Sequence, residues 1–386
     1  MSFEKPSSLE KPSLTIGLEE EYLLVNQETR DLEATPPKEL LDKCETALGS
    51  QVSPELLRTQ IEVATKVCTS IADMRDEVLR LRATIAEIAD EFGLSPIAAS
   101  THPFALWQSQ QTTEKERYIS LADDLQQIAH RLVVCGMHVH VGIDDEELRI
   151  DIMNQAAYFL PHLLALSTSS PFWEGRSTGL KSYRLSIMDE LPRTGLPQQF
   201  SSYGEFERTV AVLVKAGLIE DGTKIWWDLR PSARFPTLEM RVTDICPRVE
   251  DAVSIAALFV CICRMLYRLR RQNQRWREYP PVLIRENRWR AQRYGAEGTL
   301  VDFGKGTLVP FLDLIEELLE LVAEDAEALG CLKEVGHARE IAKSGTGADR
   351  QIERYIALKE AGAEEDEALR GVVDLIRDET LAVPAS

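Results

Sequence analysis

Three adjacent glutamates, Glu19, Glu20 and Glu21, interrupt an otherwise apolar run from Thr15 to Asn26, and this stretch constrains the fold most strongly. The run TIGLEEEYLLVN is typical of a β-strand, in which successive side chains point to opposite faces. Glu19 and Glu21 then share one face at a spacing of about 7 Å, while Glu20 points the other way. Because buried unpaired carboxylates cost free energy, the face that carries the pair must receive cations.

Three later segments, 56–67, 133–143 and 226–242, also predict strands with a polar stripe opposite an apolar one. Their stripes hold Arg58, Gln60, Glu62, Gly136, His138, His140, Gly142, Glu239 and Arg241. A half-solvated antiparallel sheet would alternate in the same way, but its wet face is usually rich in Lys, Thr and Ser. Glycine inside a strand commonly marks close approach by a ligand. We therefore predict a metal–carboxylate site on this face.

The expected ligands are rich in oxygen, contain little imidazole and include no thiolate. This set favours hard cations such as Mg²⁺ or Mn²⁺ over Zn²⁺, and Mg²⁺ beside arginines commonly handles the phosphates of ATP. The pair His138 and His140 leaves a metal-dependent amidohydrolase open as an alternative. The glutamates, however, outnumber what one Zn²⁺ requires. A catalytically silent nucleotide-binding protein is a second alternative.

Helical and strand-like segments are mixed along the chain without the regular alternation of a parallel sheet. Apolar residues recur at steps of three and four between Met74 and Phe92, which predicts an amphipathic helix. A helix with a kink at Pro161 is predicted over 150–166, and a long buried helix over 251–271. We expect an α+β fold in which helices pack on one face of an antiparallel sheet. The predicted divisions are a flexible leader (1–13), a catalytic domain (14–310) and a helical acidic lobe of the same domain (311–386).

The composition limits the classes of binding partner and the cellular compartment that we expect for this protein. The net charge of −19 argues against binding to nucleic acid or acidic lipid, both of which need basic faces. Seven cysteines at irregular spacing, without a C-x-x-C pair, are typical of reduced thiols. The longest uncharged apolar run, Ala252–Cys263, is shorter than the roughly 20 residues that cross a bilayer. We therefore expect a cytoplasmic protein with no membrane contact.

Six ordered segments carry a resemblance to a known family. They are GLEEEY, ELLRTQIEV, GMHVHVGI, SPFWEGRSTGLKSYR, WWDLRPSARFPTLEMRVTD and ENRWRAQRYG. With these segments the chain resembles the glutamate–cysteine ligase type 2 family of carboxylate–amine ligases, within the glutamine synthetase superfamily. The resemblance implies a saddle-shaped antiparallel sheet that forms a funnel, in which ATP and metals meet the acid substrate.

The resemblance also implies two metal sites. By motif position, Glu21 and Glu62 look like ligands of one metal, with Glu55 as a third. Glu55 lies at an odd interval from Glu62, so it can face the metal only at a bulge or at the start of the strand. The implied second set is Glu19, His138 and Glu239.

Arginines are expected around these metals. His140 and Arg241 would contact the phosphates, and Arg288 and Arg293 would help to hold the nucleotide. A Gly/Ser/Thr-rich loop with Arg176 and Arg184 predicts either a solvated turn or a clamp for a substrate carboxylate. The predicted substrate-binding residues are Arg176, Arg184, Arg230 and Gln60. The predicted catalytic residues are Arg184, Arg230 and Arg241.

The implied reaction joins an acid to an amine at the expense of ATP. A carboxylate attacks the γ-phosphate to give an acyl phosphate and ADP, and an amine then displaces phosphate to form the amide. The resemblance implies L-glutamate and L-cysteine as substrates and γ-glutamylcysteine as product, with a different amine as the alternative. The expected partners are thus small molecules. If the chain self-associates, we expect a dimer.

Overall fold

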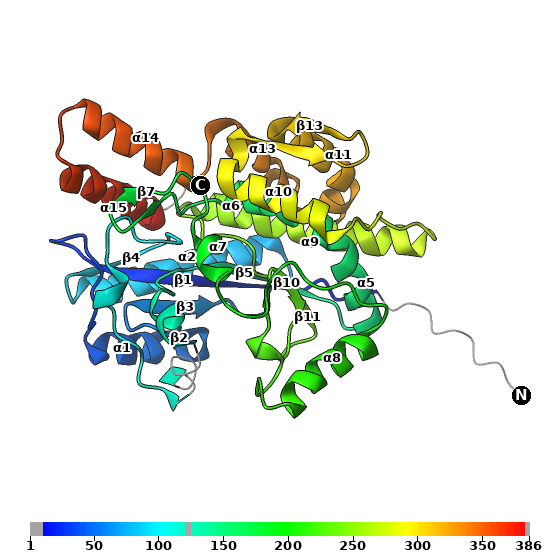
Figure 1. Ribbon diagram of the computed structural model, residues 1–386, viewed down its shortest axis with the longest axis horizontal. Coiled ribbons are helices and arrows are strands. Elements are labelled where there is room, and N and C mark those ends of the chain that lie inside the picture. Colours follow the sequence, from blue (N-terminus) through cyan, green and yellow to red (C-terminus); the bar gives the residue numbers. More distant parts are fainter. Residues whose placement is uncertain (1–10, 117, 120–124, 383–386) are drawn as a thin grey trace, which may run out of the picture.

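A seven-stranded antiparallel sheet forms the centre of the computed structural model, which describes residues 11–116, 118–119 and 125–382 (Figure 1). The strands run in the order β10 (Leu229–Pro231), β11 (Thr237–Met240), β5 (Met137–Gly142), β1 (Ile16–Asn26), β3 (Gln60–Ala64) and β2 (Val52–Pro54). A seventh strand, β4 (Leu94–Ile97), pairs with the C-terminal part of β1. The predicted α+β class with an antiparallel sheet is therefore confirmed.

Helices and short ribbons surround this sheet. The helices are α1 (Lys38–Leu48), α2 (Ile71–Asp90), α4 (Gln127–His130), α5 (Glu146–Ala156), α6 (Leu160–Ser167), α7 (Arg184–Met188), α8 (Tyr203–Lys215), α9 (Val249–Arg271), α10 (Pro281–Tyr294), α11 (Phe311–Leu329), α12 (Leu332–Gly336), α13 (Ala338–Ser344), α14 (Gly347–Glu360) and α15 (Glu365–Leu381). The ribbons pair β6 (Phe172–Trp173) with β7 (Arg176–Ser177), β8 (Thr194–Gly195) with β9 (Trp226–Trp227), and β12 (Thr299–Asp302) with β13 (Thr307–Pro310).

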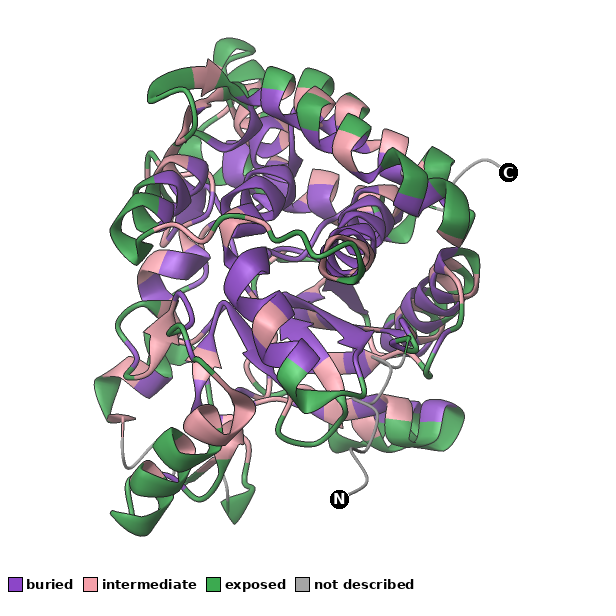
Figure 2. Ribbon diagram, turned by 90° about the vertical axis from the view of Figure 1, so that its right-hand side faces the viewer, coloured by how far each residue is buried: buried purple, intermediate pink, exposed green. Residues whose placement is uncertain are grey.

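The helices α2 and α9 cover one face of the sheet, where they contact β1, β5 and each other. The predicted spacing of α2 is confirmed, since Met74, Val78 and Leu81 are buried, and the Ser70 side chain accepts a hydrogen bond from the Asp73 amide at the helix start. Figure 2 shows buried residues gathered in the central strands and in the helix faces that pack toward them. The opposite face of the sheet is left for a cavity.

Helix α9 is long and apolar enough to cross a membrane, but 83% of its apolar window is buried inside the molecule. Helices α11 and α12 pack against α9, and α15 packs against β4. This burial explains the apolar sequence of α9 as that of a core helix.

Two predicted elements are divided in the structure. The strand predicted over 56–67 is a hairpin of β2 and β3, and Arg58 lies before β3, where it pairs with Glu114. The helix predicted over 150–166 becomes α5 and α6, with a 3₁₀ turn between them and Pro161 in the first turn of α6. Proline is tolerated there because its missing N–H would have no partner in a first turn.

The predicted domain divisions stay predictions. Residues 1–10 of the expected leader lie outside the described residues, and Ser13 donates its backbone N–H to Asp144. The acidic helices after residue 310 pack on the elements that carry the sheet, through α9 and β4.

Candidate active site

Strand register brings the polar stripes together on the face away from α2 and α9. In the pairing of β1 with β3, Glu21 lies opposite Glu62, and in the pairing of β1 with β5, Glu19 lies opposite His138. In the next pairing, of β5 with β11, His140 lies opposite Glu239. Directly paired residues have Cβ atoms about 4.5–5.5 Å apart, so neighbouring strands place these side chains in contact.

A cavity of about 450 Å³ lies over this face, within the range usual for small-molecule sites. Eleven predicted site residues line it together: Glu19, Glu21, Glu55, Gln60, Glu62, His138, His140, Arg184, Arg230, Glu239 and Arg241. Their convergence from five strands, a hairpin turn and α7 agrees with the expectation of a polar site on this face.

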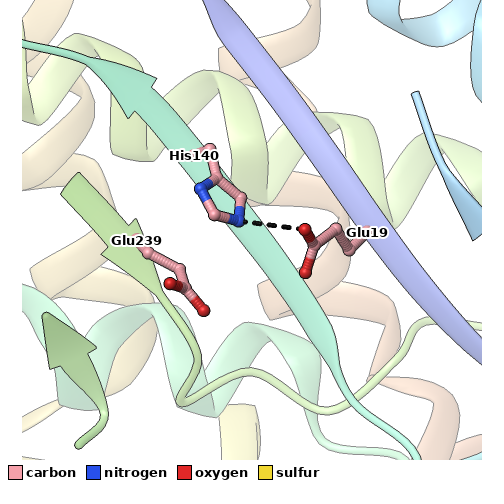
Figure 3. A group of neighbouring side chains, drawn as sticks. All are labelled: Glu19, His140 and Glu239. Carbon is pink, nitrogen blue, oxygen red and sulfur yellow. Dashed lines mark ion pairs between the residues drawn. The ribbon is translucent and has the colours of Figure 1, made fainter. Parts of the chain in front are cut away.

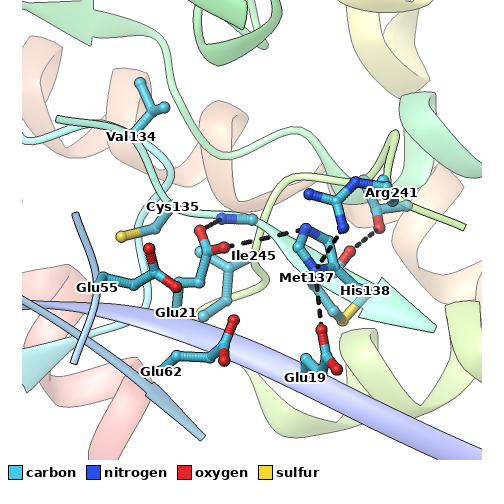
Figure 4. A network of polar contacts seen from close by, with 12 residues as sticks. Glu19, Glu21, Glu55, Glu62, Val134, Cys135, Met137, His138, Arg241 and Ile245 are labelled. Atoms are coloured by element: carbon cyan, nitrogen blue, oxygen red, sulfur yellow. Dashed lines mark hydrogen bonds and ion pairs between the residues drawn. The ribbon is translucent and has the colours of Figure 1, made fainter. Parts of the chain in front are cut away.

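Glu21, Glu55 and Glu62 form the first carboxylate group, with one oxygen from each within 4.8 Å of the others (Figure 4). In the described part of the chain, none of the three has a lysine or arginine within ion-pair distance. Burial, together with the charge of Glu21, raises the pKa of Glu55 to about 7. Burial and the charge of Glu55 also raise the pKa of Glu62. Three half-buried carboxylates without a lysine or arginine partner among the described residues fit a hard divalent cation.

The position of Glu55 follows from the hairpin. Glu55 comes directly after β2, where the chain turns toward β3, so the alternation of a single strand does not apply to it. The neighbouring Ser53 donates its hydroxyl to Glu62 over 3.0 Å. The turn of the β2–β3 hairpin, rather than a bulge or the start of a strand, therefore brings Glu55 to Glu21 and Glu62.

Glu19, His140 and Glu239 form the second group (Figure 3). His140 Nδ1 lies 2.9 Å from the Thr237 hydroxyl, which fixes the ring. His140 Nε2 lies 3.3 Å from Glu19 but, among the described residues, this buried atom has no hydrogen-bond partner. Burial would lower the pKa of His140, but Glu19 and Glu239 outweigh it and raise that pKa. An unpartnered nitrogen between two carboxylates fits a cation at this point.

Arginines already balance the charge of Glu239. Arg230 of β10 donates Nε and Nη2 to this carboxylate over 3.0 and 3.1 Å, and Arg241 pairs with the same group. Burial alone would raise the pKa of Glu239, but Arg241 and Arg230 outweigh it and lower that pKa. Arg230 itself lies within β10, directly opposite Glu239.

His138 lies between the two groups. Its Nδ1 is 3.1 Å from Glu19 and its Nε2 is 4.0 Å from Glu21 (Figure 4). Burial and the charge of Arg241 lower the pKa of His138, which favours the neutral ring that binds metals. The geometry places His140, rather than the predicted His138, beside both Glu19 and Glu239, since His140 pairs with Glu239 in the sheet.

Arg184 reaches the cavity from α7. Its guanidinium donates to the backbone oxygens of Arg241, Val242 and Thr243. It lies against Gly136, where a Cβ would overlap it, and the Gly136 amide donates to Glu21 over 2.7 Å. The close approach that this glycine permits is therefore that of a protein side chain, and one residue positions both Arg184 and Glu21.

Three predicted residues do not line this cavity. Arg176 is exposed on β7, and Arg293 is half-buried on α10 against the Tyr294 ring. Arg288 is buried, and its guanidinium pairs with Asp228 and Asp189. Two carboxylates hold Arg288 behind the cavity wall, so its donors are already engaged inside the protein.

Glu20 lies on the opposite face of β1, as the alternation predicts. Its carboxylate accepts from Arg82 of α2 over 2.9 and 2.5 Å and from the Tyr22 hydroxyl. This buried ion pair ties the sheet to the helix that covers it, which is a structural role.

Part of the cavity wall consists of residues that the sequence did not predict to line the site. The missed lining residues include Lys115, Leu132, Val134, Met188, Leu191, Lys224, Trp226 and Phe235. They do not belong to the polar stripes of the predicted strands, and Lys224 is a single lysine in the stretch DGTKIWW. No local pattern marks them, because separate segments of the chain, among them α7, β9 and several loops, bring them to the cavity.

Comparison with known proteins shows the family of the chain. The sequence model of the glutamate–cysteine ligase family 2 matches residues 15–374. The chain belongs to this family. The resemblance found in the sequence is thereby confirmed, and the family match spans the sheet, both carboxylate groups and most of the C-terminal helices.

Relatives of similar length carry the family name. A Rhodospirillum rubrum protein named "Putative glutamate--cysteine ligase 2" is 58% identical over 97% of this chain and 97% of its own length. A Herpetosiphon aurantiacus protein of the same name is 44% identical over 100% of this chain and 97% of its own.

Two solved structures share the fold. The glutamate–cysteine ligase of Francisella tularensis in complex with AMP aligns with a TM-score of 0.68 at 13% identity, over 97% of this chain and 90% of its own. A bifunctional glutathione synthetase from Pasteurella multocida also gives 0.68, at 14% identity over 95% of this chain, which spans 52% of that protein. The glutamine synthetase-like sheet expected from the sequence is thus confirmed at the level of fold.

Proposed function

We propose that the protein is an ATP-dependent carboxylate–amine ligase that joins L-glutamate to L-cysteine and releases γ-glutamylcysteine, ADP and phosphate. The family match and the names of the relatives support this class of reaction. The observation that carries the proposal is the pair of carboxylate groups in one cavity beside Arg230, Arg241 and Arg184.

The two groups suit divalent cations, for which Mg²⁺ is proposed and Mn²⁺ is the alternative. Glu21, Glu55 and Glu62 would hold one ion, and Glu19, His140 and Glu239 the other, with His138 placed to serve either. When bound, such ions supply charge neutralisation for a triphosphate.

The side chains of the chain itself would orient the reactants. Arg241 lies at Glu239 and within 3.4 Å of His138, so its charge faces the region between the groups. Arg184 is fixed by backbone oxygens on the cavity wall. Preorganised cations of this kind stabilise negative charge that develops in a transition state.

The proposed reaction balances in two steps. An oxygen of the glutamate γ-carboxylate attacks the γ-phosphorus of ATP, and ADP leaves. The cysteine amine then attacks the acyl carbon, phosphate leaves with the oxygen that bridged it, and the amine loses a proton. No side chain needs to become covalently attached in either step.

The test is ADP release by the purified protein with Mg²⁺, ATP and L-glutamate, with and without L-cysteine and then with a panel of other amines. Cysteine-dependent ADP release matched by γ-glutamylcysteine supports the proposal. Release with another amine alone keeps the reaction class and replaces the substrate. Absence of ADP with every acid–amine pair contradicts it.

A matched pair of variants checks where the activity resides. Glu19→Gln changes the cavity face of β1 and is expected to abolish ADP release. Glu28→Gln makes the same chemical change on an exposed residue just after β1 and is expected to leave ADP release unchanged.

The cytoplasmic location and the dimer stay predictions, which cell fractionation and light scattering would test.

A further inference from the structure

Lys224 is a buried lysine on the wall of the active-site cavity. It ends the 3₁₀ turn Gly222–Lys224, between α8 and β9, and its side chain is only 8% exposed. It lines the cavity that holds the two carboxylate groups. Lysine is almost never this buried unless it is paired. A strong partner is therefore expected for Lys224.

The described residues offer it only a weak partner. The sole carboxylate within ion-pair distance is that of Glu220, 3.7 Å away and 64% exposed. This distance is too long for a hydrogen bond, and a solvated surface carboxylate contributes little. Among the described residues, this exposed carboxylate is the one acidic partner of the ammonium group, and it does little to offset the cost of placing a lysine there.

The other cavity cations are already engaged or hydrated. Arg230 and Arg241 pair with Glu239, and Arg184 donates to three backbone oxygens. Lys115 and Arg234 also line the cavity but are exposed to water. Among the described lining residues, Lys224 is therefore the buried cation with donors to spare.

The turn that carries Lys224 is held in place from two sides. Its backbone oxygen accepts from Arg193 over 3.0 Å, and the preceding Thr223 oxygen accepts from Arg230 over 3.1 Å. Arg230 in turn holds Glu239 of the second group. The lysine is thus preorganised beside the chemistry rather than on a free loop.

We infer that Lys224 binds an oxyanion of a substrate in this cavity, either a phosphate of the nucleotide or a carboxylate of the acid. The inference rests on the proposed function and adds a residue to the site. Both ligands offer the charged oxygens that a buried ammonium requires, and they can be supplied separately.

Calorimetric titrations with ADP plus Mg²⁺, with L-glutamate and with inorganic triphosphate test it on wild type and on three variants. Lys224→Met removes the charge but keeps the apolar stem, and Lys224→Arg restores a cation. Lys215→Met makes the same change on exposed α8 outside the cavity. Thermal unfolding verifies that each variant is folded.

Loss of a charge-assisted hydrogen bond predicts a dissociation constant raised about 10- to 100-fold in Lys224→Met. The rise is expected for one class of probe, with partial rescue in Lys224→Arg and no change in Lys215→Met. A selective rise for ADP and triphosphate assigns a phosphate, and one for glutamate assigns a carboxylate.

Dissociation constants within twofold of wild type for all three probes overturn the inference. Wild type that binds none of them overturns it as well. Failure of the proposed function would give a different result. Wild-type protein that binds these probes but releases no ADP with any amine would refute the proposed ligase activity, while the effect of Lys224→Met on binding could still be measured.

Discussion

The two carboxylate groups of the cavity lie on neighbouring strands, but the described structure neutralises their charge to different extents. Glu239 of the second group is paired with two arginines, and its pKa is lowered despite burial. Glu55 of the first group has no such partner among the described residues, and its pKa is raised to about 7. One group is balanced by the fold and the other is not.

This contrast separates the group that the protein holds in shape without metal from the group that depends on a bound metal ion. The second group keeps its shape through permanent ion pairs, so it exists before any metal arrives. The first group stores unfavourable charge, which a bound divalent cation would relieve. Variants of the two groups should therefore affect stability differently even where they affect activity alike.

The largest effect is expected for Glu239→Ala. Removal of this carboxylate leaves Arg230 and Arg241 without their partner, which typically costs about 3–5 kcal/mol. ADP release should fall more than about 100-fold, as for loss of a preorganised charge. Urea unfolding and steady-state kinetics measure the two changes, and unaltered stability would refute the claim that the second group is balanced by these arginines.

Glu62→Gln should lower activity as severely but not lower stability. The first group loses a ligand, so ADP release should fall at least about 100-fold, beyond the 10- to 100-fold typical of groups that only support ligands. Because burial raises the pKa of Glu62, a neutral glutamine should leave the metal-free protein as stable or more stable. A clearly lower free energy of unfolding of Glu62→Gln in urea with EDTA would contradict the claim that the first group carries unbalanced charge.

The pH dependence of stability should differ with and without metal. A carboxyl group whose pKa is raised from 4.5 to about 7 binds a proton in the folded state that the unfolded chain has released. The metal-free protein should therefore lose stability as pH rises through this interval, by at most about 1.4 kcal/mol per pH unit for one proton. Stabilisation by Mg²⁺ should grow over the same interval, because the metal binds the ionised form.

Urea unfolding with EDTA and with Mg²⁺ at several pH values measures both slopes. Glu55→Gln is the control, since it removes the titrating group and should flatten the metal-free slope. A slope that persists in this variant would assign the proton to another residue.

The smallest effect on activity is expected for Glu20→Gln. This residue is flanked in sequence by members of both groups but faces α2, where it pairs with Arg82. Activity per folded molecule should stay within about threefold of wild type, while stability falls by up to about 3–5 kcal/mol because Arg82 loses its buried partner. Loss of activity comparable to that of Glu62→Gln would mean that the faces of β1 are assigned wrongly.

Local alternation was enough to assign the faces of the strands. A period of two separates Glu19 and Glu21 from Glu20 whatever the rest of the chain does. The same rule placed Glu62, His140 and Glu239 on polar stripes, and those stripes meet in one cavity. The sequence by itself therefore determined which side chains share a strand face, and its six ordered motifs determined the family.

Tertiary structure decided which groups become partners. The β2–β3 hairpin brings Glu55 to Glu21 and Glu62, and strand register places His140 beside Glu239. Ion pairs with two aspartates hold Arg288 outside the cavity. Lys224 reaches the site through a turn with no pattern of its own. Register and counter-charges arise from contacts between distant segments, so no local periodicity contains them, and only the folded chain fixes which charges are balanced.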